Sequence, residues 1–219
     1  MKTIQRVLLA ACILLSACTS AKKELRSGDL VFVGLPMDYA SGDGMDAAIV
    51  ASTGDGQLNL IHVAIVEVAP DSVYVIDATA KRGVQRHSLQ SFLQDFTLKS
   101  GEYPTFIVKR LTVPVPDAVE NAKAFCGQPY DSLFLPRNGA QYCSELIHDS
   151  YLSPSGEFLF EEYPMNWKDA DGNYPPYWVR LFGRLGVPIP QDVPGTNPQR
   201  MADSPLLEDV DVYLPACVK

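Results

Sequence analysis

The side chain best suited to covalent chemistry is Cys143, which lies where a loop is expected to become a helix, in residues 141–146. The first turn of a helix has N–H groups without partners and about half a positive charge, which lower the pKa of a thiol and can bind an oxyanion. This placement suits a nucleophile. A buried cysteine that only packs is the alternative interpretation, because free thiols are commonly buried.

His62 is the candidate base for this nucleophile, because it interrupts the apolar run of residues 58–68. Asp77 is the one acid in the next β-rich run, residues 73–78, where it would accept the imidazole N–H and fix the tautomer of the ring. A short polar connection joins the two runs, which predicts an antiparallel hairpin. A plainer interpretation is a hydrogen-bonded core histidine, since buried polar groups are normally satisfied in this way.

The other two histidines are weaker candidates. His87 lies in a basic segment that we expect to be exposed, and His148 follows Cys143 by five residues on the same predicted helix, facing away from it. The three histidines lack ligand spacing and no Cys-x-x-Cys occurs, so a metal site is not expected.

The N-terminus has the features of a bacterial lipoprotein signal. Two basic residues precede an uncharged run, residues 7–17, that is far shorter than the roughly 20 apolar residues needed to span a bilayer. The run ends in Leu15-Ser16-Ala17-Cys18, which resembles a lipobox with Cys18 as the lipidated residue. We therefore expect a signal peptide at residues 1–17, a lipid-anchored tether at residues 18–26, and a location in the cell envelope facing the periplasm. An ordinary secretory signal with a chance cysteine is the alternative.

Export makes the remaining cysteines informative, because the bacterial periplasm is oxidising. Cleavage removes Cys12 and lipidation occupies Cys18, which leaves Cys126, Cys143 and Cys217. Three is an odd number, so at least one thiol is unpaired within the monomer and needs a chemical explanation. Sequence separation does not decide whether the other two form a disulfide.

Composition and charge limit the classes of function. The chain has 219 residues, of which 47% are hydrophobic and 20% charged, which is enough to bury one substantial core and unlike a disordered or collagen-like chain. The formal net charge is −8 without a block of Lys or Arg, so the counterion-release term that drives nucleic-acid binding has no source. Nucleic-acid partners are therefore excluded.

The pattern along the chain predicts a β-rich first half followed by helices. Strands are expected at residues 30–33, 58–68, 73–78 and 105–111, and helices at residues 45–51, 118–126 and 143–151. Residues beyond 151 show little periodicity but many Pro, Trp and Tyr. No stretch has the composition of a linker, so residues 27–219 are expected to form one α+β domain.

Six short motifs follow one another in the order Ser27-Gly28-Asp29-Leu30-Val31-Phe32, Ile61-His62-Val63-Ala64-Ile65-Val66, Val75-Ile76-Asp77-Ala78 with Gly83-Val84, Gly127-Gln128-Pro129-Tyr130-Asp131, Tyr142-Cys143-Ser144-Glu145-Leu146, and Pro194-Gly195-Thr196-Asn197-Pro198 with Ser204-Pro205. In this order they resemble the circularly permuted papain-like hydrolases, in the YiiX/YebB-like branch related to NlpC-type cell-wall peptidases. The resemblance spans nearly all of residues 27–219. It implies a small antiparallel sheet or half-barrel packed against helices.

The resemblance also implies roles for the site residues: Cys143 as nucleophile, His62 as base and Asp77 as the residue that orients the base. Relatives often carry Glu at the third position, so Glu67 or Glu145 stays open as the orienting acid. The Cys143 backbone N–H would bind the oxyanion together with a second donor that the sequence does not identify.

Residues near the nucleophile are candidates for substrate binding. They are Tyr130, Asp131, Tyr142 and Glu145. A carboxylate near the scissile bond would hold a free amino group, although the first two residues are explained equally well as the cap of a turn. Aromatic residues further along would either wall a cleft or anchor their segment to the core. They are Trp167, Tyr174, Tyr177 and Trp178.

These features predict an exported cysteine peptidase or amidase without a cofactor. Its expected partners are the membrane, through the lipid anchor, and a cell-wall peptide, a small peptide or an amino-acid amide as substrate. Two alternatives remain open. One is a lipid-directed acyltransferase or esterase of the lecithin:retinol type, which uses the same His and Cys, and the other is a ligand-binding lipoprotein without turnover.

Overall fold

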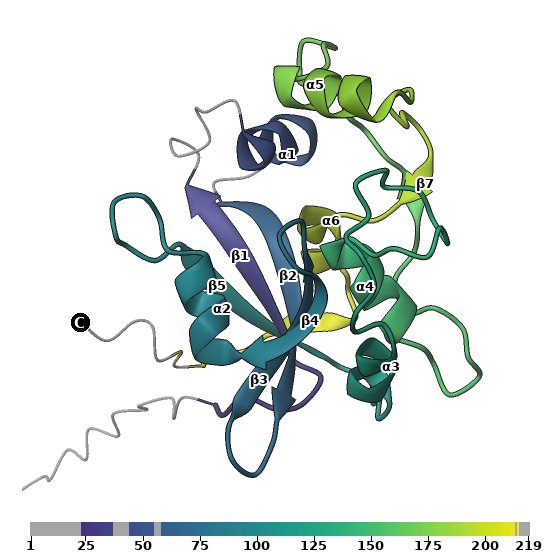
Figure 1. Cartoon of the computed structure of the whole chain (residues 1–219). Helices are drawn as coiled ribbons and strands as arrows, with labels where there is room; N and C mark the ends of the chain where they lie inside the picture. Colours follow the sequence, from purple (N-terminus) through teal and green to yellow (C-terminus); the bar gives the residue numbers. More distant parts are fainter. Residues whose placement is uncertain (1–22, 37–43, 55–57, 213, 215–219) are drawn as a thin grey trace, which may run out of the picture.

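The computed structural model describes residues 23–36, 44–54, 58–212 and 214, so the predicted signal peptide and the predicted lipidation site at Cys18 lie outside the described residues. A six-stranded antiparallel sheet of order β4-β3-β2-β1-β5-β8 forms the centre (Figure 1). Its strands are β1 (Leu30–Pro36), β2 (Leu58–Val68), β3 (Val73–Thr79), β4 (Gly83–Ser88), β5 (Thr105–Leu111) and β8 (Leu207–Asp209). The strands β6 (Tyr163–Pro164) and β7 (Pro194–Gly195) form a separate pair.

Six helices surround the sheet in the described part of the chain, so the predicted α+β class is confirmed. They are α1 (Met45–Thr53), α2 (Leu89–Asp95), α3 (Ala118–Ala124), α4 (Cys143–Ser150), α5 (Pro176–Leu185) and α6 (Pro198–Ala202). Among the residues with described positions, none belongs to a helix long and apolar enough to cross a bilayer.

Helices cover both faces of the sheet, as the nearly continuous burial of β2 requires. On one face, α3 and α4 pack against alternate strand residues such as Phe32 and Ile65. On the other face, α2 inserts Phe92 against the intervening residues, such as Val31 and Val66. Figure 1 shows α1 and α5 side by side at the end of the sheet where β1 ends and β2 begins.

The pairing of β1 with β2 changes register at His62. Val33 pairs with His62, whereas the next residue, Gly34, pairs with Leu60, so Ile61 is an extra residue in β2. A bulge of this kind bends the strand and changes the direction of the side chains beside it. The bulge therefore sets the direction of the candidate base.

The Ser27-Gly28-Asp29 motif forms a clamp between β1 and β5. The buried Asp29 carboxylate accepts hydrogen bonds from Nε and Nη2 of Arg110 at 2.6 and 2.7 Å, and from the Arg26 N–H at 2.8 Å. The Gly28 carbonyl accepts a bond from Tyr151 Oη at 2.8 Å, which connects the clamp to the end of α4. The same Arg110 also donates to the Glu24 carbonyl at 2.9 Å, so the last residues of the predicted tether lie against the domain.

The predicted elements agree best with the structure where the apolar pattern is strong. The strands β2 and β5 have the predicted bounds, and β3 and α4 differ from the prediction by one residue. The prediction missed β4 and α2, and it was wrong beyond residue 151, where α5 and α6 form. The helix α5 buries Trp178, Leu181 and Phe182 at helical spacing, but the prolines around this short set conceal the pattern.

Candidate active site

The structure brings Cys143, His62 and Asp77 together from α4, β2 and β3, and all three are buried. His62 Nε2 lies 2.8 Å from Asp77 Oδ2. In the pairing of β2 with β3, Ile65 lies opposite Ile76. The same register continued by one residue sets Asp77 opposite Ala64. Asp77 and His62 are therefore diagonal neighbours on one face of the sheet. Because Nε2 is bound to Asp77, Nδ1 is the ring nitrogen available for the hydrogen bond that His62 makes with the Cys143 side chain.

His87 is a second imidazole on the same carboxylate. Its Nε2 lies 2.9 Å from Asp77 Oδ1 and its side chain is 11% exposed, so the expectation that His87 is exposed was wrong. The reason is strand β4, in which Gln85 pairs with Asp77 and His87 is the diagonal neighbour. The basic residues around His87 concealed this strand in the sequence. Asp77 therefore binds one histidine with each oxygen.

These contacts set the charges of the three groups. Burial lowers the pKa of His62, but the Cys143 thiolate and the hydrogen bonds to Asp77 and Cys143 outweigh it and raise this pKa to about 10. Burial raises the pKa of Asp77, but hydrogen bonds from His62 and His87 outweigh it and hold this pKa at about 2. The ionised Asp77 only accepts, so both histidines donate through Nε2–H. An imidazolium beside a thiolate is the charge state expected of an activated cysteine.

Cys143 is the first residue of α4, after Tyr142 as N-cap in an extended conformation. The first bond of the helix runs from the Leu146 N–H to the Tyr142 carbonyl at 3.0 Å. The Cys143 N–H therefore has no acceptor within the helix and can donate to an oxyanion beside the thiol.

Contacts of Tyr142 and Glu145 hold this first turn in place. The Glu145 carboxylate accepts the Tyr142 N–H at 3.4 Å, and Tyr142 Oη accepts the Thr196 N–H at 3.0 Å. A Cβ on Gly195 would lie 2.8 Å from Tyr142 Oη, so a residue without a side chain is needed there. Burial, together with two nearby acids, raises the pKa of Glu145 to about 8.

A cavity of about 180 Å³ opens beside Cys143 and His62. Its walls come from α1, from the end of β3, from the loop before α4 and from the residues that precede α6. Most wall area is apolar, and the aromatic residues in it are Phe96, Tyr130, Phe134, Tyr142, Trp167 and Trp178. The two tryptophans also pack edge to face with ring centroids 4.8 Å apart, so they both line the cavity and anchor their segments.

The predicted substrate-binding residues divide into two pairs. Those that line the cavity are Tyr130 and Tyr142, and those that do not are Asp131 and Glu145. Asp131 instead caps the loop behind the cavity, since its oxygens accept the N–H groups of Leu133 and Leu135, each at 2.8 Å. This cap supports Phe134, whose φ of 53° is unusual for a residue other than glycine. Asp131 therefore shapes the cavity wall.

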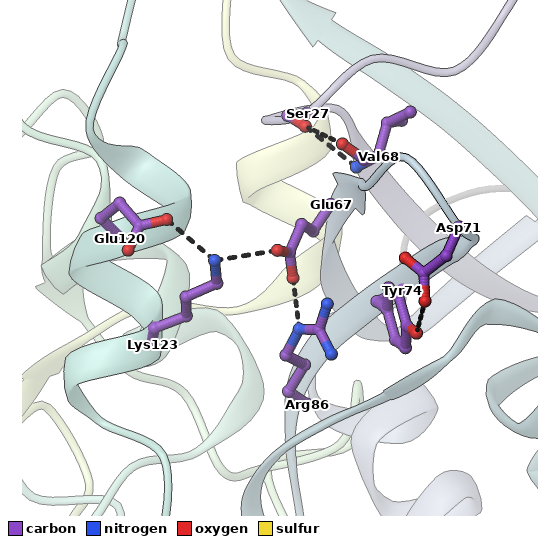
Figure 2. A network of polar contacts seen from close by, with 8 residues as sticks. All are labelled: Ser27, Glu67, Val68, Asp71, Tyr74, Arg86, Glu120 and Lys123. Carbon is purple, nitrogen blue, oxygen red and sulfur yellow. Dashed lines mark hydrogen bonds and ion pairs between the residues drawn. The ribbon is translucent and has the colours of Figure 1, made fainter.

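Glu67, the alternative orienting acid, belongs to a separate ion-pair network on the other face of β2. Figure 2 shows its carboxylate between Arg86 and Lys123, whose nitrogens lie 2.5 and 2.8 Å away. The hydrogen bond from Arg86 is the main cause that lowers the pKa of Glu67. Lys123 also pairs with Glu120, so the network joins the sheet to α3. Asp77 is the acid in contact with His62.

The comparisons with known proteins identify the family of the chain. The family described as "Permuted papain-like amidase enzyme, YaeF/YiiX, C92 family" matches residues 24–211. The chain belongs to this amidase family. The chain is 32% identical over 91 residues to the uncharacterized protein YiiX of Escherichia coli K12. This match spans 42% of the chain and 44% of YiiX, less than half of that relative. A crystal structure described as that of the metalloprotein YiiX from Escherichia coli O157:H7 aligns with a TM-score of 0.64 at 24% sequence identity. The alignment covers 87% of the present chain and 98% of the YiiX chain, so the two share the same fold.

The sequence did not predict a metal site, and a metalloprotein among the structural relatives of the chain raises the question again. Within the described ranges, no three His, Cys, Asp or Glu side chains are grouped so that they could hold a metal ion. Cys126 and Cys143 have no disulfide partner among the described residues, and Cys217 lies outside them.

Several of the sequence motifs serve to build the site. Gly83 has a φ of 68°, and a Cβ there would lie 2.3 Å from the Gln128 carbonyl. That carbonyl accepts the Val84 N–H at 3.0 Å, so the close approach docks the loop before Tyr130 on β4. Asn197 caps α6 by accepting the Arg200 N–H at 2.8 Å.

Removal of the second imidazole is expected to slow catalysis at this site. His87→Leu should lower kcat about 10- to 100-fold with little change in KM, because Asp77 loses a charge-assisted hydrogen bond of about 1.5–3 kcal/mol and with it a fixed orientation. His87→Gln keeps a donor and should recover most of this loss. Steady-state kinetics on a chromogenic amide measures both variants, and an unchanged kcat in His87→Leu would show that His62 alone fixes the carboxylate.

Proposed function

We propose that the protein is an exported cysteine amidase or peptidase that cleaves an amide bond in a small peptide, a cell-wall peptide or an amino-acid amide. The observation that carries this proposal is the contact chain from Cys143, at the start of α4, through His62 to Asp77, at the side of a small cavity. Nucleophile, base and orienting acid thus stand in the order that acyl transfer through a thioester needs.

In the proposed mechanism the Cys143 thiolate attacks the carbonyl carbon of the amide and forms a tetrahedral intermediate. The Cys143 N–H donates to the oxyanion. The His62 imidazolium then gives its Nδ1 proton to the nitrogen of the leaving amine, and the C–N bond breaks to leave a thioester on Cys143. The neutral His62 takes a proton from a water molecule, whose oxygen attacks the thioester and releases the carboxylic acid and the thiolate. Asp77 keeps Nδ1 directed at the sulfur throughout.

The cavity supports a small substrate rather than a lipid. With a volume of about 180 Å³, it accommodates an amino-acid side chain or a short acyl group. Two polar side chains of its wall, Ser144 and Thr196, have buried hydroxyl oxygens without a partner among the described residues. Unsatisfied polar atoms beside a nucleophile suit a substrate with hydrogen-bonding groups next to the scissile bond.

A substrate panel tests the proposal. The purified protein would be offered aminoacyl amides, peptidoglycan fragments and phospholipids, with Cys143→Ala as the inactive control and Cys126→Ser as the control for the exposed thiol. We expect release of amines from the first two classes that depends on Cys143 and not on Cys126. Fatty-acid release from phospholipids would instead support the lipid-directed alternative, and binding without any release would support the ligand-binding alternative.

The charge of His62 offers a test that needs no substrate. The thiolate is one cause of the raised His62 pKa, so Cys143→Ala should move the imidazole titration from about 10 to a clearly lower pH. In the wild type, activity should decline as the pH rises through about 10, because His62 then loses the proton that the leaving amine needs. NMR of labelled histidine measures the titration, with Cys126→Ser as control. The same midpoint in Cys143→Ala would contradict the ion pair.

We also propose that the protein is anchored in the cell envelope through Cys18. The support is the sequence alone, namely the short apolar run that ends in a lipobox. Cys18→Ala should move the protein from the membrane fraction to the soluble periplasmic fraction while its amidase activity is retained. Cell fractionation with immunodetection measures this, and a variant that stays in the membrane would exclude lipidation at Cys18 as the anchor.

A further inference from the structure

The cavity has a carboxylate that the proposed mechanism does not use. Asp46, in the first turn of α1, is the one acid among the described residues that line the cavity. The structure gives its carboxylate no hydrogen bond or ion pair in the part of the chain that it describes, and its side chain remains accessible from solvent. Asp46 is close enough to His62 for their charges to interact.

The charge of Asp46 is not needed to neutralise His62. The single positive charge of the His62 imidazolium already faces two negative charges, on the Asp77 carboxylate and the Cys143 thiolate. Protein atoms crowd Asp46 and raise the pKa of its carboxyl, an effect that His62 partly opposes. Because Asp46 lines the cavity and has no hydrogen bond or ion pair among the described residues, its carboxylate is available to a cation that binds there.

The other walls also suit a cationic ligand. The ring faces of aromatic side chains attract an ammonium group, and the cavity is rich in them, with Tyr130 and Trp178 among its wall residues. The unpartnered hydroxyls of Ser144 and Thr196 can accept further N–H donors. The small volume favours a primary ammonium on a short substrate.

We propose that Asp46 binds a substrate ammonium group, so that the preferred substrates are amides with a free amino group near the scissile bond, such as aminoacyl amides and peptides with a free amino terminus. The inference deepens the proposed function and rests on it for the reaction. Asp46 is then a specificity-determining residue that contacts the substrate, and acetylation of the amino group removes its partner.

Binding tests this inference apart from turnover. In the Cys143→Ala protein, L-leucinamide and N-acetyl-L-leucinamide would be titrated at pH 6.5, where the free amine is charged, with intrinsic fluorescence as readout. The chain has two tryptophans, and both line the cavity. We expect leucinamide to bind at least about 10-fold more tightly than its acetylated analogue. In the Cys143→Ala background, Asp46→Asn should abolish this difference in affinity, and Asp46→Glu should restore part of it. The control is Asp171→Asn, which removes an exposed loop carboxylate and should leave the difference unchanged.

Equal binding of both ligands, or a preference that survives Asp46→Asn, would overturn the inference. Turnover by the wild type separates this result from a failure of the proposed function. Hydrolysis that depends on Cys143 but is equally fast for the free and the N-acetylated amide would overturn the ammonium site alone. A binding preference that depends on Asp46, together with no hydrolysis of any amide, would support the ammonium site and overturn the amidase proposal.

Discussion

His62→Ala is expected to lower kcat for amide hydrolysis by about four orders of magnitude or more, because it removes the group that activates the thiol and protonates the leaving amine. Asp77→Asn should cost about two to four orders of magnitude with little change in KM, since an amide at this position no longer fixes the tautomer of His62. The double variant should lose little more than His62→Ala, because residues that act as a unit are not additive.

The control for this cycle is Glu67→Gln, which removes a buried carboxylate from the opposite face of β2. Its partners are Arg86 and Lys123, so the variant should change stability and leave kcat within a few-fold of the wild type. Single-turnover and steady-state kinetics on one amide substrate measure all four variants. Additive losses in the double variant, or an active Asp77→Asn beside an inactive Glu67→Gln, would assign the orienting role to another acid.

Asp29→Ala is expected to reduce the free energy of unfolding by about 3–5 kcal/mol, because it leaves the Arg110 guanidinium largely buried without its partner. The pair is bidentate, and Asp29 also accepts the Arg26 N–H, so three hydrogen bonds are lost at once. Urea denaturation followed by circular dichroism measures the change.

The neighbouring ion pair on β5 provides a matched control. Lys109 pairs with Asp209, whose side chain is 78% exposed, so Asp209→Ala should cost less than about 1 kcal/mol. Asp29→Ala combined with Arg110→Leu should be more stable than Asp29→Ala alone, since no buried charge is left unpaired. Equal stability of Asp29→Ala and Asp209→Ala would mean that the clamp contributes nothing beyond an ordinary surface pair.

The sequence was sufficient to predict the strands that carry His62 and Asp77 and the helix that begins at Cys143. Each has a strong local signal, either a β-branched apolar run or a polar residue within one. The hydrogen bond between His62 and Asp77 depends on the register of β2 and β3, which the sequence left open and which the structure provides.

His87 and Asp46 could not be predicted, for two physical reasons. The contact of His87 with Asp77 arises across the third strand of a meander, and the charged residues of that strand resemble those of a loop. Asp46 reaches the cavity only because α1 folds over the end of the sheet beside α5, a tertiary placement with no local signal. The sequence also suggested Asp131 and Glu145 as substrate contacts from proximity to Cys143 in the chain, whereas in space they support the cavity from behind.

The segments that form the walls of the cavity are far apart along the chain, which determines when during synthesis the site can be complete. They are drawn from α1 and β2 early in the chain, from the start of α4, and from Thr196 and its neighbours near residue 200. A chain that is synthesised and translocated from its N-terminus presents His62 and Asp77 first, the thiol later, and the last wall only when β7 and α6 have arrived. Under the export and activity proposed above, an incompletely translocated chain would have no finished substrate site, so hydrolysis would begin only after the whole domain has crossed the membrane.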